Sequence, residues 1–211
     1  MDIIAHRGFW GEGRPKNSRA AFQSAFDFGF GVETDVRDFN GDLVISHDIP
    51  LSGCMPFSDF LDLYKQSGSP GTLALNIKSD GLQDLLAKSL STAGVSRYFV
   101  FDMSVPDGLG YLKKGLNVFT RQSEFERDLA FYDEAVGVWL DEFQRHWISD
   151  SVLDAHVLHQ KACCIVSPEL HGRDYEAEWE HYRSWINRQN GVKLGLCTDD
   201  PDRAKTYFLN P

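Results

Sequence analysis

The sequence predicts an α/β fold in which helices cover a parallel sheet. Short runs rich in β-branched and aromatic residues alternate with helical segments along the whole 211-residue chain, and this alternation is typical of a parallel sheet. Several runs are almost continuously apolar, as in strands covered on both faces. About eight βα units fit a compact (β/α)8 TIM barrel, and an open doubly wound sheet is the alternative.

Nine segments are predicted as strands from their composition and from the turn residues around them. They are residues 3–5, 32–36, 43–46, 73–77, 98–101, 117–120, 136–140, 162–166 and 193–197. Asn40-Gly41 is a hairpin signal that joins the second and third of these strands.

Helical segments are predicted between the strands. Ser18 can cap a helix whose apolar residues recur at helical spacing from Ala21 to Phe26 and which ends near Gly29. The further predicted helices are residues 58–66, 82–93, 108–114, 124–132, 149–159, 175–187 and 202–208. No linker, low-complexity tract or internal repeat interrupts the alternation, so the sequence predicts a single domain over residues 1–211.

The composition is that of a packed globular protein with an acidic surface. Hydrophobic residues make up 42% of the chain and charged residues 25%, which excludes a disordered chain. Lys and Arg number 21 against 31 Asp and Glu, a formal net charge of −10. Such a surface repels a phosphate backbone, so we expect no nucleic-acid partner. A small anionic substrate stays compatible with it, because a few local cations can define a pocket.

The sequence predicts a cytoplasmic protein without a membrane span. An acid at Asp2 and a basic pair after three apolar residues differ from a signal peptide, which has a basic start and an apolar core of roughly 7–15 residues. No stretch approaches the roughly 18 apolar residues of a membrane-spanning helix. The four Cys residues show no C-x-x-C spacing, and we expect them to be buried free thiols.

Two polar motifs follow or occupy the first predicted strands. His6 and Arg7 end the first strand, where an imidazole can transfer protons and a guanidinium can hold phosphate. Glu33 and Asp35 lie two apart on the next strand and therefore project from one face. Inside a barrel these carboxylates call for a hard cation such as Mg2+ or Ca2+. The alternatives are a surface His-Arg turn and carboxylates that face solvent or pair with Arg7 and Lys78.

Two further strand ends carry matching chemistry. His47 ends the third predicted strand, and two imidazoles facing each other across a substrate can act as general acid and general base. Asn76 and Lys78 share one face of the next strand. An Asn carbonyl oxygen can ligate a hard cation, and a Lys ammonium can hold a phosphate oxygen.

These residues belong to a longer pattern with a family resemblance. In chain order it comprises Ile3-Ile4-Ala5-His6-Arg7-Gly8, Pro15-Lys16-Asn17-Ser18, Ala20-Ala21-Phe22, Gly31-Val32-Glu33-Thr34-Asp35-Val36, Asp42-Leu43-Val44 and His47-Asp48. The pattern resembles the N-terminal signature of the glycerophosphodiester phosphodiesterases, relatives of the phosphatidylinositol-specific phospholipases C. Thr198-Asp199-Asp200-Pro201 resembles that family's closing strand-to-helix motif. Between residues 80 and 190 only the spacing of strands and helices agrees.

The resemblance implies a (β/α)8 barrel, a divalent cation and a diester substrate cleaved by two His residues. Carried over by position, it implies His6 and His47 as the acid-base pair, Arg7 and Lys78 as phosphate contacts, and Glu33 and Asp35 as metal ligands.

Two positions depart from the family's pattern. Lys16 stands where the family's Pro-Glu-Asn triplet has an acid, and Asn76 replaces the Glu of Glu-Ile-Lys, which is a metal ligand in the family. We expect Asn76 to offer the cation a neutral oxygen, and Lys16 to lie close enough to hold the phosphate or to repel the cation. Both changes remove negative charge around the cation, so weaker metal binding or an altered substrate is expected.

Later strand ends are also polar and would ring the mouth of a barrel. They are Asp102 and Ser104, Thr120-Arg121, Asp141-Glu142, and the segment from Ser167 to His171. Trp139 and Trp147 fit buried packing better than stacking on a sugar or polyol. His146, His156, His159 and His181 lie away from the predicted strand ends, and we assign them no role.

The sequence thus favours a cation-dependent phosphodiesterase over two alternatives. One is a binding or scaffold protein with a degraded site, which Lys16 and Asn76 support and the His pair opposes. The second is a metal-free lyase, in which Lys16 or Arg7 replaces the cation as in the bacterial phospholipase C relatives.

Overall fold

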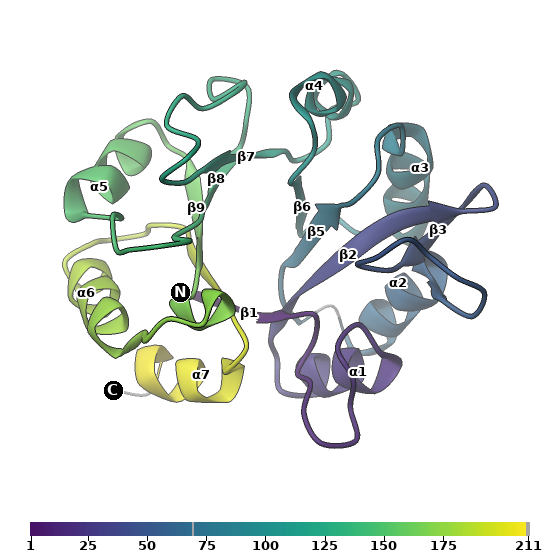
Figure 1. The fold of residues 1–211 in the computed structure, drawn as a ribbon, viewed down its shortest axis with the longest axis horizontal. Helices are drawn as coiled ribbons and strands as arrows, with labels where there is room; N and C mark the ends of the chain where they lie inside the picture. The colour runs from purple at the N-terminus through teal and green to yellow at the C-terminus, as the bar shows by residue number, and fades with distance from the viewer. Residues whose placement is uncertain (69, 210–211) are drawn as a thin grey trace.

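Eight parallel strands enclose the centre of the molecule in the computed structural model, which describes residues 1–68 and 70–209 (Figure 1). Pairing runs from β1 through β2 and β5 to β6 in one direction, and from β1 through β10, β9 and β8 to β7 in the opposite direction. The strands are β1 (Asp2–His6), β2 (Gly31–Phe39), β5 (Leu73–Ile77), β6 (Tyr98–Phe101), β7 (Phe119–Gln122), β8 (Gly137–Leu140), β9 (Ala162–Val166) and β10 (Leu194–Thr198).

The two arms of the sheet meet between β6 and β7. Val100 and Val118 form a parallel bridge there, and the backbone N–H of Val100 donates to the carbonyl oxygen of Asn117 at 2.8 Å. This contact brings the ends of the pairing order together, so the fold is a (β/α)8 barrel. The alternative prediction of an open doubly wound sheet is wrong.

Helices surround the strands on the outside of the barrel (Figure 1). They are α1 (Arg19–Asp27), α2 (Phe57–Gln66), α3 (Gln83–Ala93), α4 (Val105–Lys113), α5 (Asp150–Leu158), α6 (Glu176–Asn187), α7 (Pro201–Leu209) and the short 3-10 helix η1 (Pro168–His171). Ser18 caps α1 as predicted, because its hydroxyl accepts a hydrogen bond from the backbone N–H of Ala21 at 3.2 Å. Within residues 1–68 and 70–209, no helix is long and apolar enough to cross a bilayer.

The predicted helix over residues 124–132 is wrong, because this segment is a loop between β7 and β8. The Ser123 hydroxyl accepts hydrogen bonds from the backbone N–H groups of Phe125 and Glu126. The Glu124 carboxylate accepts three more from the backbone N–H groups of residues 143–145. These side-chain contacts give the backbone alternatives to helical hydrogen bonds, which is the usual reason that Ser favours turns over helix interiors.

A hairpin extends β2 beyond the barrel. β3 (Asp42–Ile45) pairs antiparallel with the end of β2, and β4 (Met55–Pro56) pairs with β3. Asn40 and Gly41 both have positive φ, +53° and +88°, which confirms the hairpin turn predicted for them. The backbone N–H of Ser46 donates to the carbonyl oxygen of Asp35 at 3.0 Å. The hairpin therefore returns to the barrel beside Asp35.

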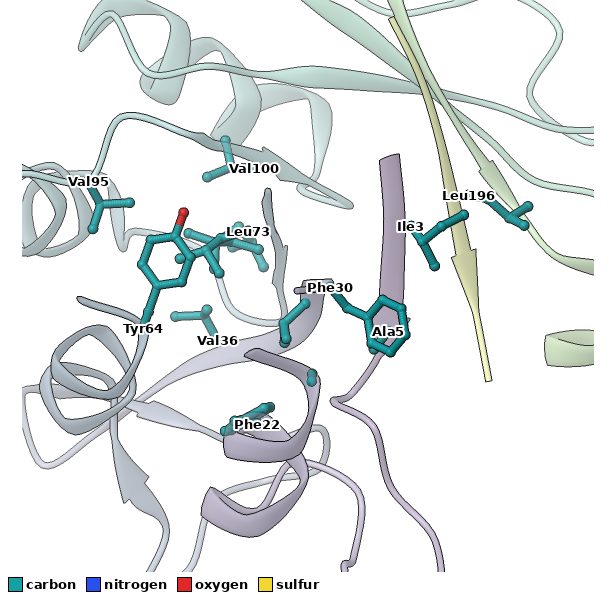
Figure 2. Packing of buried hydrophobic residues seen from close by; sticks show 14 of the residues in the cluster. Ile3, Ala5, Phe22, Phe30, Val36, Tyr64, Leu73, Val95, Val100 and Leu196 are labelled. Atoms are coloured by element: carbon teal, nitrogen blue, oxygen red, sulfur yellow. The ribbon is translucent and has the colours of Figure 1, made fainter. Parts of the chain in front are cut away.

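The core has an outer and an inner layer. The outer layer packs strand side chains such as Val36 and Leu73 against helix side chains such as Phe22 and Tyr64 (Figure 2). The inner layer fills the barrel with side chains that include Phe101 and Trp139, whose rings stack 3.9 Å apart. Trp139 is thus buried in packing, as predicted.

Candidate active site

A cavity of about 330 Å³ opens at the carboxyl ends of the barrel strands. In barrels of this type the carboxyl ends carry the active site. The aromatic rings of Phe101, Trp139 and Phe143 contribute to its lining. Its polar lining residues are His6, Arg7, Glu33, His47, Asn76, Lys78, Asp102, Arg121, Asp141 and His171.

A larger cavity of about 700 Å³ opens at the opposite end of the barrel. Its lining residues include Asp2, Arg97 and Lys193, and none of the described residues that line it is a His or a Glu. The smaller cavity combines three His residues with carboxylates and cationic side chains, and we take it as the candidate active site.

A tight turn after β1 places Arg7 at the cavity. Arg7 and Gly8 have positive φ, +56° and +87°. A Cβ at Gly8 would lie 2.8 Å from the carbonyl carbon of Ala21, so only Gly allows the chain to pass this close to α1. The backbone N–H of Arg7 donates to the carbonyl oxygen of Glu33 at 2.9 Å. The turn thereby fixes Arg7 beside the carboxylates of β2.

Glu33 and Asp35 both lie on the inner face of β2. Val32 and Val36, on the alternate face, belong to the outer core, and the two carboxylates are buried, with exposed fractions of 2% and 0%. Asp35 Oδ2 accepts a hydrogen bond from Asn17 Nδ2 at 2.8 Å and lies 3.0 Å from Arg7 Nε. The convergence expected from their spacing is therefore present.

Burial raises the pKa of Glu33 to about 7, and the charge of Asp35 adds to this increase. His6, Arg7 and Lys78 act in the opposite direction, and His6 Nε2 lies 3.9 Å from Glu33 Oε2. Glu33 is thus a carboxylate whose negative charge is incompletely compensated by the protein.

Two buried oxygens of the site have no hydrogen-bond donor. Asp35 Oδ1 and Asn76 Oδ1 are both buried without a hydrogen-bond partner. The two residues are register partners on β2 and β5, so their backbones lie side by side. Buried carboxylate and amide oxygens without donors suit a hard cation such as Mg2+ or Ca2+. Lys78 Nζ, 3.6 Å from Asp35 Oδ1, supplies part of the positive charge.

Asp199 holds His6 and was not assigned from the sequence. His6 Nδ1 lies 2.7 Å from Asp199 Oδ1, so a proton on Nδ1 donated to this carboxylate leaves Nε2 free for chemistry. Trp10 Nε1 also donates to Asp199 Oδ1, at 3.0 Å. Burial alone would raise the pKa of Asp199, but the hydrogen bond from His6 leads the contacts that hold it below its usual range.

Lys16 also binds Asp199, at 3.1 Å between Nζ and Oδ2. Its ammonium lies over the ring of Trp10, 4.3 Å from the centroid. The structure thus places Lys16 at the carboxylate that also contacts His6, and it is not among the residues that line the cavity.

His47 enters the cavity from the hairpin rather than from a barrel strand. It follows β3, and its side chain is 45% exposed. Nδ1 lies 2.9 Å from Asp48 Oδ1, and Arg37 Nε donates to the His47 carbonyl oxygen at 3.2 Å. His6 and His47 line the same cavity, so the structure brings the two imidazoles together at the mouth.

Cations from two further strands complete one side of the cavity. Lys78 Nζ donates to Asp102 Oδ2 at 3.1 Å, and Arg121 binds the same carboxylate. Asp102 has a positive φ of +74°, a conformation that Asp tolerates better than most residues. Arg7, Lys78 and Arg121 thus present three cationic groups where a phosphate could bind.

Asp141 and His171 form a further pair in the lining of the cavity. His171 Nε2 lies 2.6 Å from Asp141 Oδ1. The His171 ring also packs against Phe143, with centroids 4.7 Å apart. This pair comes from the β8 end and η1, as the polar strand ends in the sequence indicated.

Two solved structures share this architecture. A glycerophosphodiester phosphodiesterase from Agrobacterium tumefaciens has a TM-score of 0.66 and 15% identity, over 95% of this chain and 97% of its own. A glycerophosphoryl diester phosphodiesterase from Parabacteroides distasonis has a TM-score of 0.68 and 16% identity, over 98% of this chain and 85% of its own. The fold is that of the glycerophosphodiester phosphodiesterases.

The similarity to glycerophosphodiester phosphodiesterases lies in the fold. No protein-family model matches the chain, and no curated protein sequence matches it. The barrel expected from the N-terminal pattern is confirmed, and the roles of individual residues depend on the geometry of the site.

We expect Glu33→Gln to change how stability depends on pH in cation-free protein. The folded-state pKa of Glu33, about 7, is above its ordinary value of 4.5. The folded state therefore binds more protons, and the free energy of unfolding falls as pH rises from about 4.5 to about 7, by up to about 3 kcal/mol. Glu33→Gln should remove this fall, as measured by urea unfolding with a chelator at pH 5 and pH 8.

The exposed Glu12→Gln serves as the matched control, because it removes a carboxylate that faces solvent. If the free energy of unfolding depends on pH in the same way in the wild type and in Glu33→Gln, Glu33 has no uncompensated charge.

Proposed function

We propose that this protein is a phosphoric diester hydrolase that acts on a glycerophosphodiester-like small molecule. The observation that carries the proposal is the cavity at the strand ends, where His6 and His47 lie with phosphate-binding cations around a buried carboxylate pair. The fold likeness supports it, because both solved neighbours are named as phosphodiesterases of this type.

The cationic side chains would bind and orient the diester. Arg7 and Lys78 lie within 3.0 Å and 3.6 Å of Asp35, so their charges are fixed beside the carboxylates. Arg121 approaches from β7. A phosphate held by these groups would have its two ester oxygens positioned in the cavity, which lowers the entropic part of the barrier.

His6 and His47 would move the protons of the reaction. One imidazole removes a proton from the attacking hydroxyl, which is either water or a neighbouring hydroxyl of the substrate. The new P–O bond forms as the bond to the leaving group breaks, and the second imidazole protonates the leaving oxygen. Where the substrate's own hydroxyl attacks, water then opens the cyclic phosphate. Asp199 keeps the His6 ring in place and favours the tautomer with Nε2 free.

A divalent cation, Mg2+ or Ca2+, would be held by Glu33, Asp35 and Asn76. When bound, such an ion neutralises phosphate charge and orients the nucleophile. The orphaned oxygens of Asp35 and Asn76 support this assignment, as does the raised pKa of Glu33, whose proton competes with a cation. Cation affinity should accordingly increase as pH rises through about 7.

A metal titration of diester turnover tests the proposal and its two rivals together. Chelator-treated protein is assayed with glycerophosphodiesters while Mg2+ or Ca2+ is added. Turnover that requires the ion supports the proposal, whereas turnover in chelator supports the metal-free lyase, in which Lys16 or Arg7 replaces the cation. A protein that binds diester without turning it over would be a degraded binding barrel, and the hydrolase proposal would be wrong.

We keep the cytoplasm as the proposed location and a small diester as the proposed partner. Cys163, Cys164 and Cys197 are buried free thiols, and Cys54 is a partly exposed one. Free thiols suit a reducing compartment.

A further inference from the structure

A second polar cluster lies behind the wall of the cavity, between the end of β8 and α6. Glu142 follows β8, His146 lies in the next loop, and Glu178 lies on α6. One ligand atom from each residue lies within 4.8 Å of the other two. Both carboxylates are buried, whereas the His146 side chain is 36% exposed and leaves a path from solvent.

Glu142 is held as a charged carboxylate. Its Oε1 lies 2.9 Å from His146 Nδ1 and accepts hydrogen bonds from two backbone N–H groups, those of Trp147 and Ile148. Its Oε2 accepts one from the Tyr182 hydroxyl at 2.9 Å. Burial would raise the pKa of Glu142, but the hydrogen bonds, that from His146 first, lower it to about 2.

Glu178 has an oxygen without a donor. Its Oε1 binds Arg173, but its Oε2 is buried without a hydrogen-bond partner and lies 3.8 Å from His146 Nδ1. The residue is 8% exposed. Burial and the neighbouring Glu142 raise the pKa of Glu178 to about 8. A buried carboxylate oxygen that faces a second carboxylate and an imidazole needs a proton or a metal cation between them.

A chain of two imidazoles leads away from the same point. His146 Nε2 lies 3.0 Å from His181 Nδ1, and His181 Nε2 lies 2.8 Å from Asp150 Oδ1. With the contact from His146 Nδ1 to Glu142, the chain has three hydrogen bonds. Two neutral imidazoles carry only two ring N–H groups. The third contact, at His146 Nδ1, therefore needs an additional proton or a different cation.

We propose that Glu142, His146 and Glu178 bind one transition-metal cation of the Zn2+ type through His146 Nδ1 and a carboxylate oxygen of each Glu. Both imidazoles are then neutral, with His146 Nε2–H donating to His181 and His181 Nε2–H donating to Asp150. Metal-ligating His residues usually donate their second ring N–H in this way. An imidazole with two carboxylates suits Zn2+, whereas Mg2+ prefers oxygen ligands alone.

Arg173 lies beside the site without occupying it. Its guanidinium binds Glu178 Oε1 and lies 3.8 Å from Glu142 Oε2, which leaves Glu178 Oε2 for the ion. The ion would join the loop after β8 to α6. Since Asp141, the neighbour of Glu142, holds His171 at the cavity, this joint would stiffen the cavity wall. The inference goes beyond the proposed hydrolase activity and does not depend on it.

Calorimetry of the full, chelator-treated chain with Zn2+ tests the proposal. Excess Mg2+ is present to compete with Zn2+ for the Glu33 and Asp35 site. We expect one equivalent of Zn2+ to bind. His181→Ala should weaken binding roughly 10- to 100-fold, the usual effect of losing a partner of a metal-ligating His. His146→Ala and Glu178→Gln, which remove ligands, should weaken it further.

Two controls separate this site from the mouth of the barrel. Glu33→Gln and the exposed His159→Ala should leave Zn2+ binding unchanged. In a separate measurement with Co2+ in place of Zn2+, the absorption spectrum of the complex should change when His146 is replaced. Zn2+ binding that persists in Glu178→Gln and His146→Ala but is lost in Glu33→Gln would assign the ion to the mouth and overturn the proposal. Absence of Zn2+ binding to the wild-type chain at micromolar concentration would overturn it as well.

Discussion

Replacement of His6 or His47 by Ala is expected to lower phosphodiester turnover by roughly 100-fold or more, the usual scale for a general acid or base. Both imidazoles line the cavity that holds Arg7 and Lys78. Each variant would leave one of the two proton transfers to water. Steady-state turnover of a glycerophosphodiester at saturating cation measures the loss.

The leaving alcohol separates the two roles. In a 4-nitrophenyl diester the leaving group is 4-nitrophenolate, which does not need to be protonated as it leaves. The variant that lacks the general acid should therefore regain most of its activity on that substrate. The variant that lacks the general base should stay impaired on both substrates. Comparing the two variants on both diesters therefore assigns acid and base to His6 and His47.

His159→Ala is the matched control, because this His is exposed at the C-terminal end of α5. Each variant should unfold at a urea concentration close to that of the wild type. Unchanged turnover on both substrates in either variant would remove that His from the mechanism.

The common face of Glu33 and Asp35 could be predicted because it depends only on strand alternation. Residues two apart on a strand share a face whatever the fold around them, and Val32 and Val36 on the alternate face are apolar. The barrel was predicted for a similar reason, since alternating strands and helices limit the possible topologies. Such features can be predicted because they depend on residues that are close together in the sequence.

The partner of His6 depends on closure of the barrel and has no local pattern. Asp199 is 193 residues away along the chain, and pairing of β1 with β10 brings the two strand ends together. The available signal was an unassigned carboxylate directly after the last strand. The same closure takes Lys16 to Asp199, although its place in the motif suggested a position at the cation or phosphate.

The helix predicted over residues 124–132 is wrong for a local reason. The apolar spacing suits a helix, but side-chain hydrogen bonds to the backbone stabilise a loop instead. Ser123 and Glu124 satisfy backbone N–H groups with their side chains, and Arg121 binds the Glu126 carboxylate at 2.5 Å. Arg121 is at the cavity. The contact thus connects this loop to the site. The predicted helix over the same residues did not imply such a connection.

The last expected result concerns Asn76, where a carboxylate should strengthen the cation site. Asn76 is the register partner of Asp35, and its Oδ1 is buried without a donor. Affinity for Mg2+ and Ca2+ rises with the number of charged ligands, so Asn76→Glu should tighten binding by roughly tenfold or more. Arg7 and Lys78 beside Asp35 provide positive charge that limits repulsion among the carboxylates before the ion binds.

Calorimetry with Mg2+ and Ca2+ measures this effect, and two variants control it. Asn76→Gln changes the length of the side chain but keeps its amide, so it should not tighten binding. Lys16→Glu adds a negative charge beside Asp199 rather than Asp35, so it should disturb His6 without improving cation affinity. The double variant Asn76→Glu with Lys16→Glu should therefore bind as Asn76→Glu does. If neither single variant nor the double variant binds the cation more tightly, Asn76 is not a ligand and the metal-free or non-catalytic alternatives gain support.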